Sequence, residues 1–315
     1  MTRGTVVVTG GAGFIGVRLG EILVDRGYDL RIFDNLSRPD VDAMNALLDT
    51  GHVELVEGDI RYGDSVQRAI TGADYVVHLA AVSINKSQAD PGESLDINMI
   101  GSNNVFQAAA DEGVKRLVFA SSASVYGDPE SLPMTEDGPF HPATPYCLSK
   151  LAAEQLLAFY GRTAGLSWNA LRYFNVYGPG QKVSAYYTSV VLHFLNRLRA
   201  GEAPIIDGDG SQSMDFIHVT DIAIATADAM ECEDSGYSMN VGTGIDTSIA
   251  ELARILIDAA EVDVEPIFRP RDVLVSRRAA DISLAEEVMG WKPTIAVEDG
   301  MTDLVRSLVT SGTGV

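Results

Sequence analysis

The first half of the chain alternates short, almost continuously apolar runs with longer segments in which apolar and polar residues mix. Runs rich in Val, Ile, Leu and aromatic residues are typical of parallel strands that helices cover on both faces. The predicted strands are Thr5–Thr9, Leu30–Asp34, Val53–Val56, Tyr75–Ala81 and Arg116–Ser122. Helices are predicted between them, for example at Phe14–Arg26 and Asn98–Glu112. This alternation predicts an α/β fold with a doubly wound parallel sheet, the Rossmann arrangement.

The pattern changes after about Arg172, where glycine and proline become denser around 178–180 and 207–210. A helix is predicted at Ser189–Arg199, and another begins after Ser248, which forms a capping box with Glu251. Ser238–Val241 is predicted to be a late strand that could rejoin the sheet. We therefore expect a sheet domain over 1–172 and a smaller, interleaved α/β domain over 173–315, with segments near 214–242 returning to the first.

Length and composition indicate an ordinary globular protein. The chain has 315 residues, of which 46% are hydrophobic, and this is enough to bury a large core. No apolar run is long enough to cross a bilayer, and the N-terminus enters a predicted strand without a signal-peptide pattern. A cytoplasmic location is the expectation.

The formal net charge of −21 disfavours binding to nucleic acid and to anionic membranes. An anionic substrate would therefore need a local cluster of positive groups. The two cysteines, Cys147 and Cys232, provide neither a disulfide framework nor metal-ligand spacing. The five histidines are scattered, so no metal site is expected, and His78 and His218 are expected to be buried and hydrogen-bonded.

A glycine-rich turn links the first predicted strand to the first predicted helix. Gly10, Gly13 and Gly16 form the spacing GxxGxxG. Gly10 permits a tight turn, Gly13 lets backbone N–H groups approach a pyrophosphate, and Gly16 lets the helix pack closely on the strand. Because the glycines lie between a strand and a helix, they predict a dinucleotide site.

An acidic residue ends the second predicted strand at the position where a ribose-binding carboxylate is expected, roughly twenty residues after the glycine loop. Asp34 would accept hydrogen bonds from the adenosine ribose and repel a 2′-phosphate, which favours NAD over NADP. The next residue is Asn35 and not arginine. Asp59 and Ile60 follow the third strand and could border the adenine, although Asp59 could equally cap a turn.

Tyr146 and Lys150 stand four residues apart, so on a helix they would share one face. The hydroxyls of 121–124 follow the fifth strand, at the carboxyl edge of the sheet where ligands bind in this architecture. A phenol is a weak base at neutral pH, but a nearby ammonium and a positively charged nicotinamide lower its pKa. Tyr146 could then take a proton from a sugar hydroxyl while the carbon below gives hydride to NAD.

Together, six motifs resemble the extended short-chain dehydrogenase/reductase family, and within it the nucleotide-sugar epimerases and dehydratases. They are TGGAGFIG at 9–16, HLAA at 78–81, SSASVYG at 121–127, YCLSK at 146–150, RYFNVYGPGQ at 172–181 and DGDGSQSMDFIHVTDIA at 207–223. The resemblance implies catalytic roles for Ser122, Tyr146 and Lys150, with Ser124 as the second choice of serine. Lys150 would also hold the cofactor ribose.

The resemblance further implies two sets of contacts. Phe14 and Ile15 would offer backbone amides to the NAD phosphates. The other cofactor contacts would be Asn35, Leu79, Ala80, Ala81, Asn98, Ser121, Tyr146, Lys150 and Tyr173. Asn175 and Arg269 would bind the substrate diphosphate, since a guanidinium fork suits phosphate oxygens. The remaining substrate contacts would be Ser122, Ser124, Tyr146, Asp272 and Ser276.

Two departures from the family pattern affect the substrate site. Met214 stands where the family often has a phosphate-binding arginine, so Arg269, Arg271, Arg277 or Arg278 would have to compensate. The stretch from Asp272 to Asp281 is also about two residues longer than usual. Counting forward from Asp272 places Ser276 beside the C2 substituent of the sugar and admits an N-acetyl group. Counting back from Asp281 places Arg278 there.

The leading hypothesis is NAD-dependent 4-epimerisation of a UDP-sugar, either UDP-glucose/UDP-galactose or the N-acetyl forms. A sugar 4,6-dehydratase or a decarboxylase of the same family is the alternative, and a non-catalytic NAD-sensing protein is a third reading. These alternative reactions need extra acid/base groups, for which the family places carboxylates just after the catalytic Ser/Thr, and this chain has Ala123 and Ser124 there. The resemblance also implies a homodimer that pairs helices such as Asn98–Glu112 and Pro145–Thr163 in a four-helix bundle.

Overall fold

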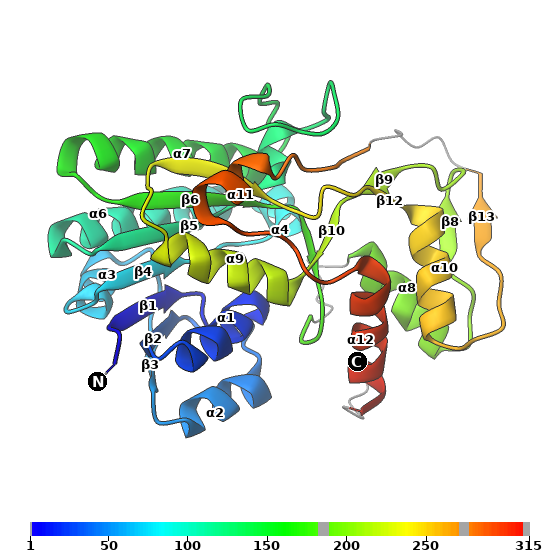
Figure 1. The fold of residues 1–315 in the computed structure, drawn as a ribbon, viewed down its shortest axis with the longest axis horizontal. Helices are drawn as coiled ribbons and strands as arrows, with labels where there is room; N and C mark the ends of the chain where they lie inside the picture. The colour runs from blue at the N-terminus through cyan, green and yellow to red at the C-terminus, as the bar shows by residue number, and fades with distance from the viewer. Residues whose placement is uncertain (1, 182–188, 271–276, 311–315) are drawn as a thin grey trace.

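A computed structural model describes residues 2–181, 189–270 and 277–310. Its centre is a parallel sheet in the order β11-β6-β5-β4-β1-β2-β3 (Figure 1). The strands are β1 (Thr5–Thr9), β2 (Asp29–Asp34), β3 (Val53–Glu57), β4 (Tyr75–His78), β5 (Arg116–Ser122), β6 (Trp168–Tyr173) and β11 (Tyr237–Val241). The doubly wound fold is thus confirmed. The strand order reverses between β1 and β4, and ligands bind at such a reversal.

The five early strands agree with prediction, apart from their ends. β4 stops at His78 because the chain then turns across Gly10, so Leu79, Ala80 and Ala81 lie in a loop. β11 pairs with β6 in parallel, and it includes the late strand predicted at Ser238–Val241. β6 itself was not predicted.

Helices cover both faces of the sheet. One face carries α1 (Phe14–Asp25), α2 (Val41–Asp49) and α9 (Val219–Glu231), and the other carries α3 (Gly63–Ile70), α6 (Ser102–Glu112) and α7 (Pro145–Ala164) (Figure 1). The helix predicted from Asn98 begins earlier, as a π-helical segment at Asp96–Gly101 that continues into α6. Two short helices, α4 (Ile84–Ala89) and α5 (Pro91–Leu95), precede it. α7 starts where the Thr144 hydroxyl accepts a hydrogen bond from the N–H of Cys147.

A smaller lobe lies beside one end of the sheet (Figure 1). Its core packs α8 (Val190–Arg199), α10 (Ile249–Ala259) and α12 (Val297–Thr310). Three two-stranded pairs complete it: β13 (Ile267–Arg269) with β8 (Ile205–Asp207), β12 (Thr247–Ser248) with β9 (Ser213–Met214), and β10 (Phe216–His218) with β7 (Asn175–Tyr177). α11 (Ser283–Met289) packs on β11. The Ser248 hydroxyl accepts from the N–H of Glu251, which confirms the predicted cap of α10.

Candidate active site

The glycine loop combines two close backbone approaches with one open position. Gly10 has a φ of +69°, and a Cβ there would lie 2.7 Å from the amide nitrogen of Ala80. A Cβ on Gly16 would lie 2.5 Å from the Cα of Gly11. At Gly13, by contrast, a Cβ would meet only the carbonyl oxygen of Gly10, at 3.4 Å. The space over Gly13, at the N-terminus of α1, can therefore admit a phosphate group.

The carboxylate of Asp34 lies next to the glycine loop, on the side where the adenosine of the cofactor is predicted to bind. Its Oδ2 accepts a hydrogen bond from the N–H of Ala12 at 3.0 Å, and its Oδ1 accepts one from Leu36 at 2.8 Å. Burial raises the pKa of Asp34, while these two N–H groups oppose that shift. Because each carboxylate oxygen can accept a further hydrogen bond, Asp34 can still bind both hydroxyls of a ribose.

The other residues predicted near the adenosine also follow β2 and β3. Asn35 accepts a hydrogen bond from the N–H of Ser37 at 3.1 Å. Asp59 forms an ion pair with Arg61 at 2.7 Å, and the hydrogen bonds from Arg61 lower the pKa of Asp59. Ile60 is buried, and its carbonyl accepts from the side chain of Asn104. Parallel strands bring all of these to the same edge as the glycine loop.

We expect NADP to bind about 100-fold more weakly than NAD, or worse, because a 2′-phosphate would face Asp34 as like charge on like charge. Titration of both cofactors into the protein measures the ratio. The variant Asp34→Ser should reduce the difference between the two affinities by raising the affinity for NADP. Asp42 is an acidic residue on the neighbouring helix α2, and Asp42→Ser serves as the control. Equal affinities in the wild-type protein would contradict the assignment of Asp34.

A polar set between β4 and α7 holds the loop after β4 in place. The Oδ1 of Asn98 accepts from the N–H of Val82 at 2.9 Å, and its amide donates to the Ser149 hydroxyl at 3.3 Å. His78 is fully buried, with Nδ1 2.6 Å from the Thr9 hydroxyl and Nε2 2.9 Å from that of Ser102. Burial lowers the pKa of His78 to about 3, so it is a neutral structural residue.

Tyr146 and Lys150 lie on one face of α7, as their spacing predicts. The Lys150 Nζ is 5.8 Å from the centre of the Tyr146 ring and donates to the carbonyl of Ala120 at 2.7 Å. Lys150 is buried, and burial lowers its pKa to about 7 against the opposing charge of Glu154. The ammonium is thus fixed to the last part of β5, beside the residues predicted to be catalytic.

Ser122 ends β5 and begins a 3₁₀ turn, Ala123–Tyr126. Its hydroxyl accepts a hydrogen bond from the N–H of Ser124 at 3.2 Å, which leaves its proton available to a ligand. The Ser124 hydroxyl oxygen is buried and has no hydrogen-bond partner among the described residues. Ala123 is buried. The turn therefore carries two hydroxyls, of which that of Ser124 is buried, and no carboxylate.

Two residues predicted to contact the cofactor have their hydroxyls engaged elsewhere. The Ser121 hydroxyl donates to Glu154, inside the protein. The Tyr173 hydroxyl is 2.7 Å from that of Thr226, in the core between the sheet and α9. Any contact of these two residues with NAD would have to come from their backbone or from the tyrosine ring.

The residues predicted to bind the diphosphate lie apart in the fold. Asn175, in β7, donates both its backbone and its side-chain N–H to the carbonyl of Asp215. Arg269 forms an ion pair with Asp207 at 2.6 Å, and β13 lies on the far side of the smaller lobe from β5 (Figure 1). The structure therefore does not place Arg269 beside Ser122. Met214 is partly buried against the core of the smaller lobe.

Two further arginines that could replace the phosphate-binding arginine absent at Met214 lie in the described part of the chain. Arg277 is paired with Asp246 at 2.7 Å. Arg278 has a long contact with Asp128, at 3.8 Å, directly after the turn that follows Ser122. Of the other predicted residues, Arg271, Asp272 and Ser276 lie outside the described part of the chain.

The sequence analysis missed a buried ionic network behind the site. Arg172 in β6 and Glu154 in α7 form an ion pair at 2.7 Å, and Arg172 also donates to the Tyr126 hydroxyl at 2.7 Å. The available signal was spacing: Glu154 is a lone acid in an apolar stretch of helix, four residues after Lys150. Its partner could not be deduced from that spacing.

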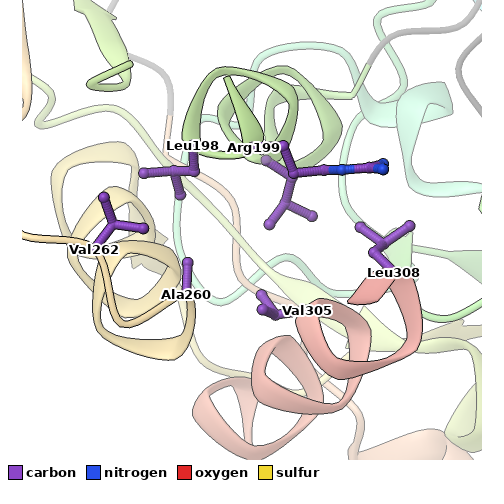
Figure 2. Close-up of a pocket in the computed structure, with 7 residues that line it drawn as sticks. Leu198, Arg199, Ala260, Val262, Val305 and Leu308 are labelled. Atoms are coloured by element: carbon purple, nitrogen blue, oxygen red, sulfur yellow. The ribbon is translucent and has the colours of Figure 1, made fainter. Parts of the chain in front are cut away.

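A cavity of about 360 Å³ lies in the smaller lobe, lined by residues of α8, of α12 and of the segment after α10 (Figure 2). Arg199 is its charged lining residue, and the rest of the lining comes from the apolar residues Leu195, Leu198, Ala260, Val262, Val305 and Leu308. It contains none of the predicted site residues. Over the described ranges, no three or more His, Cys, Asp or Glu side chains are grouped to hold a metal ion, and no helix there is long and apolar enough to span a membrane.

The model of the NAD dependent epimerase/dehydratase family matches residues 6–242. The chain belongs to this family. A UDP-glucose 4-epimerase from Mycolicibacterium smegmatis is 34% identical over 309 residues, which cover 95% of this chain and 97% of that protein. These matches include both the glycine loop and the Tyr146–Lys150 pair.

Two solved structures of family members have the same fold over almost the whole chain. A UDP-N-acetylglucosamine 4-epimerase from Methanobrevibacter ruminantium, in complex with UDP-N-acetylmuramic acid, has a TM-score of 0.92 at 32% identity and covers 99% of this chain and 100% of its own. A UDP-glucose 4-epimerase from Thermus thermophilus, in complex with NAD, has a TM-score of 0.85 at 32% identity, and the match covers 97% of this chain and 99% of that one. This family member is thus an NAD-dependent epimerase, and NAD is its cofactor.

Proposed function

We propose that this family member interconverts the C4 epimers of a UDP-sugar through a transient 4-keto sugar. The observation that carries the proposal is the arrangement of Tyr146 and a buried Lys150 on one face of α7, with Lys150 bound to the carbonyl of Ala120, two residues before Ser122 in β5. The relatives named above are 4-epimerases of UDP-sugars, which supports the same substrate class here.

In the proposed reaction, Tyr146 takes the proton of the C4 hydroxyl and later returns it. NAD, held by the glycine loop and Asp34, would supply the acceptor and donor of the hydride of that carbon. The ammonium of Lys150 favours the ionised phenol, since opposite charges at short range stabilise one another. Ser122 donates its hydroxyl proton to the sugar oxygen and so relays hydrogen bonding between substrate and Tyr146.

Inversion requires the keto sugar to turn over between the two half-reactions. The diphosphate would then serve as the pivot, with Asn175 and Arg269 as its proposed ligands, and binding to Arg269 requires the diphosphate to extend from the sheet edge toward β13. Arg269 would exchange its exposed ion pair with Asp207 for phosphate oxygens, which a guanidinium also binds in a bidentate manner. Exposed ion pairs contribute little to stability, so this exchange costs little.

A 4,6-dehydratase would need more than this site offers. It must remove the C5 proton and protonate the departing C6 hydroxyl, which requires a base and an acid within hydrogen-bond reach of those atoms. The two positions after Ser122 hold a buried methyl group, Ala123, and a neutral hydroxyl, Ser124. This lack of a carboxylate favours epimerisation.

The product decides between the alternatives. The protein with NAD is incubated with UDP-glucose, UDP-galactose, UDP-N-acetylglucosamine and UDP-glucuronate, and products are examined by NMR and mass spectrometry. We expect an unchanged mass, an inverted C4 and no net formation of NADH. Loss of water would show a dehydratase, loss of carbon dioxide a decarboxylase, and an absence of turnover would favour an NAD sensor. Reaction of UDP-N-acetylglucosamine would favour the register with Ser276, not Arg278, beside the sugar.

We also propose a homodimer formed through α6 and α7. Large apolar side chains are exposed on this side: Ile100 by 55%, Leu148 by 51% and Phe159 by 49%. The double variant Ile100→Glu/Leu148→Glu should halve the mass measured by light scattering, because charges at the centre of an interface oppose its burial. Ile245→Glu, at an equally exposed position outside these helices, is the control. A monomeric wild-type protein would contradict the proposal.

A further inference from the structure

Glu154 and Arg172 form a bidentate ion pair in the interior. Their side chains are 2% and 5% exposed, and Arg172 reaches both carboxylate oxygens, Nη2 to Oε2 at 2.7 Å and Nε to Oε1 at 3.1 Å. Burying two charges is costly, and apolar residues of similar size often serve stability as well or better. Stability alone therefore does not explain this ion pair, and a role in the adjoining site would explain it.

The position of Glu154 connects it to that site. It lies one helical turn after Lys150 and two turns after Tyr146, so the three side chains follow one face of α7. Lys150 donates to the carbonyl of Ala120, and the hydroxyl of the next residue, Ser121, donates to Glu154. The two charged side chains of α7 thus hold consecutive residues of β5, and Ser122 comes next.

The surroundings of Lys150 leave Glu154 as its counter-charge. From β4, His78 faces it as a neutral, fully buried imidazole. From β5 it meets the ring of Phe119, at 4.8 Å from the centre, and the carbonyl of Ala120. From α7 the ring of Tyr146 lies 5.8 Å away, and Glu154 is the opposite charge that acts on Lys150; the positive charge of Arg172 in β6 is already bound to Glu154.

We propose that Glu154 is a positioning residue of this site: its carboxylate keeps Lys150 in the ammonium form and, through Ser121, fixes the end of β5 that carries Ser122. The inference rests on the proposed roles of Lys150 and Tyr146 in the reaction. It adds that Arg172 has a matching task, because it pairs with the Glu154 carboxylate in the interior, where a lone charge would be costly.

The charges determine in which direction the loss of Glu154 would shift the pKa of Lys150. Burial lowers the pKa of Lys150 to about 7, and Glu154 opposes this shift. Without the carboxylate, Lys150 would lose its proton at a lower pH. An activity that needs the ammonium would then begin to fall at a lower pH as the pH rises, by about one unit, the usual effect of one close opposite charge.

Lysine NMR tests the inference without any substrate. The chain has five lysines, so ¹³Cε-labelled lysine gives few signals, and Lys150→Arg assigns the one that matters. Glu154→Gln keeps an oxygen for Ser121 and Arg172 but removes the charge. We expect the titration midpoint of Lys150 to fall by about one pH unit in this variant. An unchanged midpoint would overturn the inference.

Glu154→Gln leaves Arg172 buried without its counter-charge and could therefore unfold the protein. A second variant that removes both charges keeps the test valid in that case. In Glu154→Gln/Arg172→Met both charges are removed together, and we expect a midpoint that is still below the wild-type value but higher than in Glu154→Gln, because the charge of Arg172 no longer repels the ammonium. A wild-type midpoint in this double variant would mean that Glu154 only balances Arg172. If the Lys150 signal shifts while the basic limb of the activity profile does not, the proposed role of Lys150 in the reaction fails and its dependence on Glu154 stands.

Discussion

Replacing Tyr146 with phenylalanine is expected to lower turnover by about 10²–10⁴, the usual contribution of a general base. The change removes one hydroxyl and keeps the ring, so the packing of α7 and the 5.8 Å contact with Lys150 remain. The affinity for NAD and the melting temperature should stay close to those of the wild-type protein. Initial rates with the substrate identified by the product assay, together with NAD titration, measure both effects.

A second tyrosine on the same helix provides the control for this variant. Tyr160 donates its hydroxyl to Asn103 at 3.0 Å, and it lies four helical turns beyond Tyr146. Tyr160→Phe should therefore cost a fraction of the stability and leave turnover unchanged. If Tyr146→Phe retained most of its activity, the base would have to be sought in another group at this edge of the sheet.

Replacing Gly10 with alanine should lower the free energy of unfolding by about 2–5 kcal/mol and weaken NAD binding as well. Two costs combine at this position. The φ of +69° is unfavourable for any side chain, and the new Cβ would lie 2.7 Å from the backbone nitrogen of Ala80. Relief of that clash must move the glycine loop or the loop after β4, and both border the predicted cofactor site.

Gly51→Ala separates the two costs. Gly51 has a similar φ of +74°, but a Cβ there would have nothing within 4 Å. This variant should lose only the conformational part, about 1–2 kcal/mol, and should bind NAD normally. Denaturant titration of both variants gives the difference between them. Equal losses would mean that the approach of Gly10 to Ala80 carries no energetic weight.

Prediction of the large sheet from the sequence failed at β6, a strand that carries two buried polar side chains. β6 was not recognised because Asn169 and Arg172 interrupt its apolar run. Both are nevertheless buried in the middle of the sheet, since Asn169 donates to the carbonyl of Ala229 at 3.1 Å and Arg172 binds Glu154. A sequence pattern does not reveal partners that the fold brings from other elements.

The residues of the candidate site likewise fall into two groups: those that local spacing predicts and those whose partners are distant along the chain. The glycine loop and the Tyr146–Lys150 pair rest on spacings within a single turn or helix, where local geometry decides which atoms meet, and Asp34 ends the next strand of the same βαβ unit. The hydroxyl of Tyr173, in contrast, is taken up by Thr226, and the guanidinium of Arg269 by Asp207. These partners are 53 and 62 residues away along the chain.

The sequence by itself determined the alternating layers, the dinucleotide loop and the pair of residues on α7, because each depends on the periodicity of strands and helices or on glycine at a turn. Only the tertiary structure decided that Lys150 is buried against β5, that Glu154 pairs with Arg172 and that Arg269 lies across the smaller lobe from Ser122. The physical reason is burial: the charge of a lysine or an arginine depends on which distant groups replace its water, and the folded chain alone sets those neighbours.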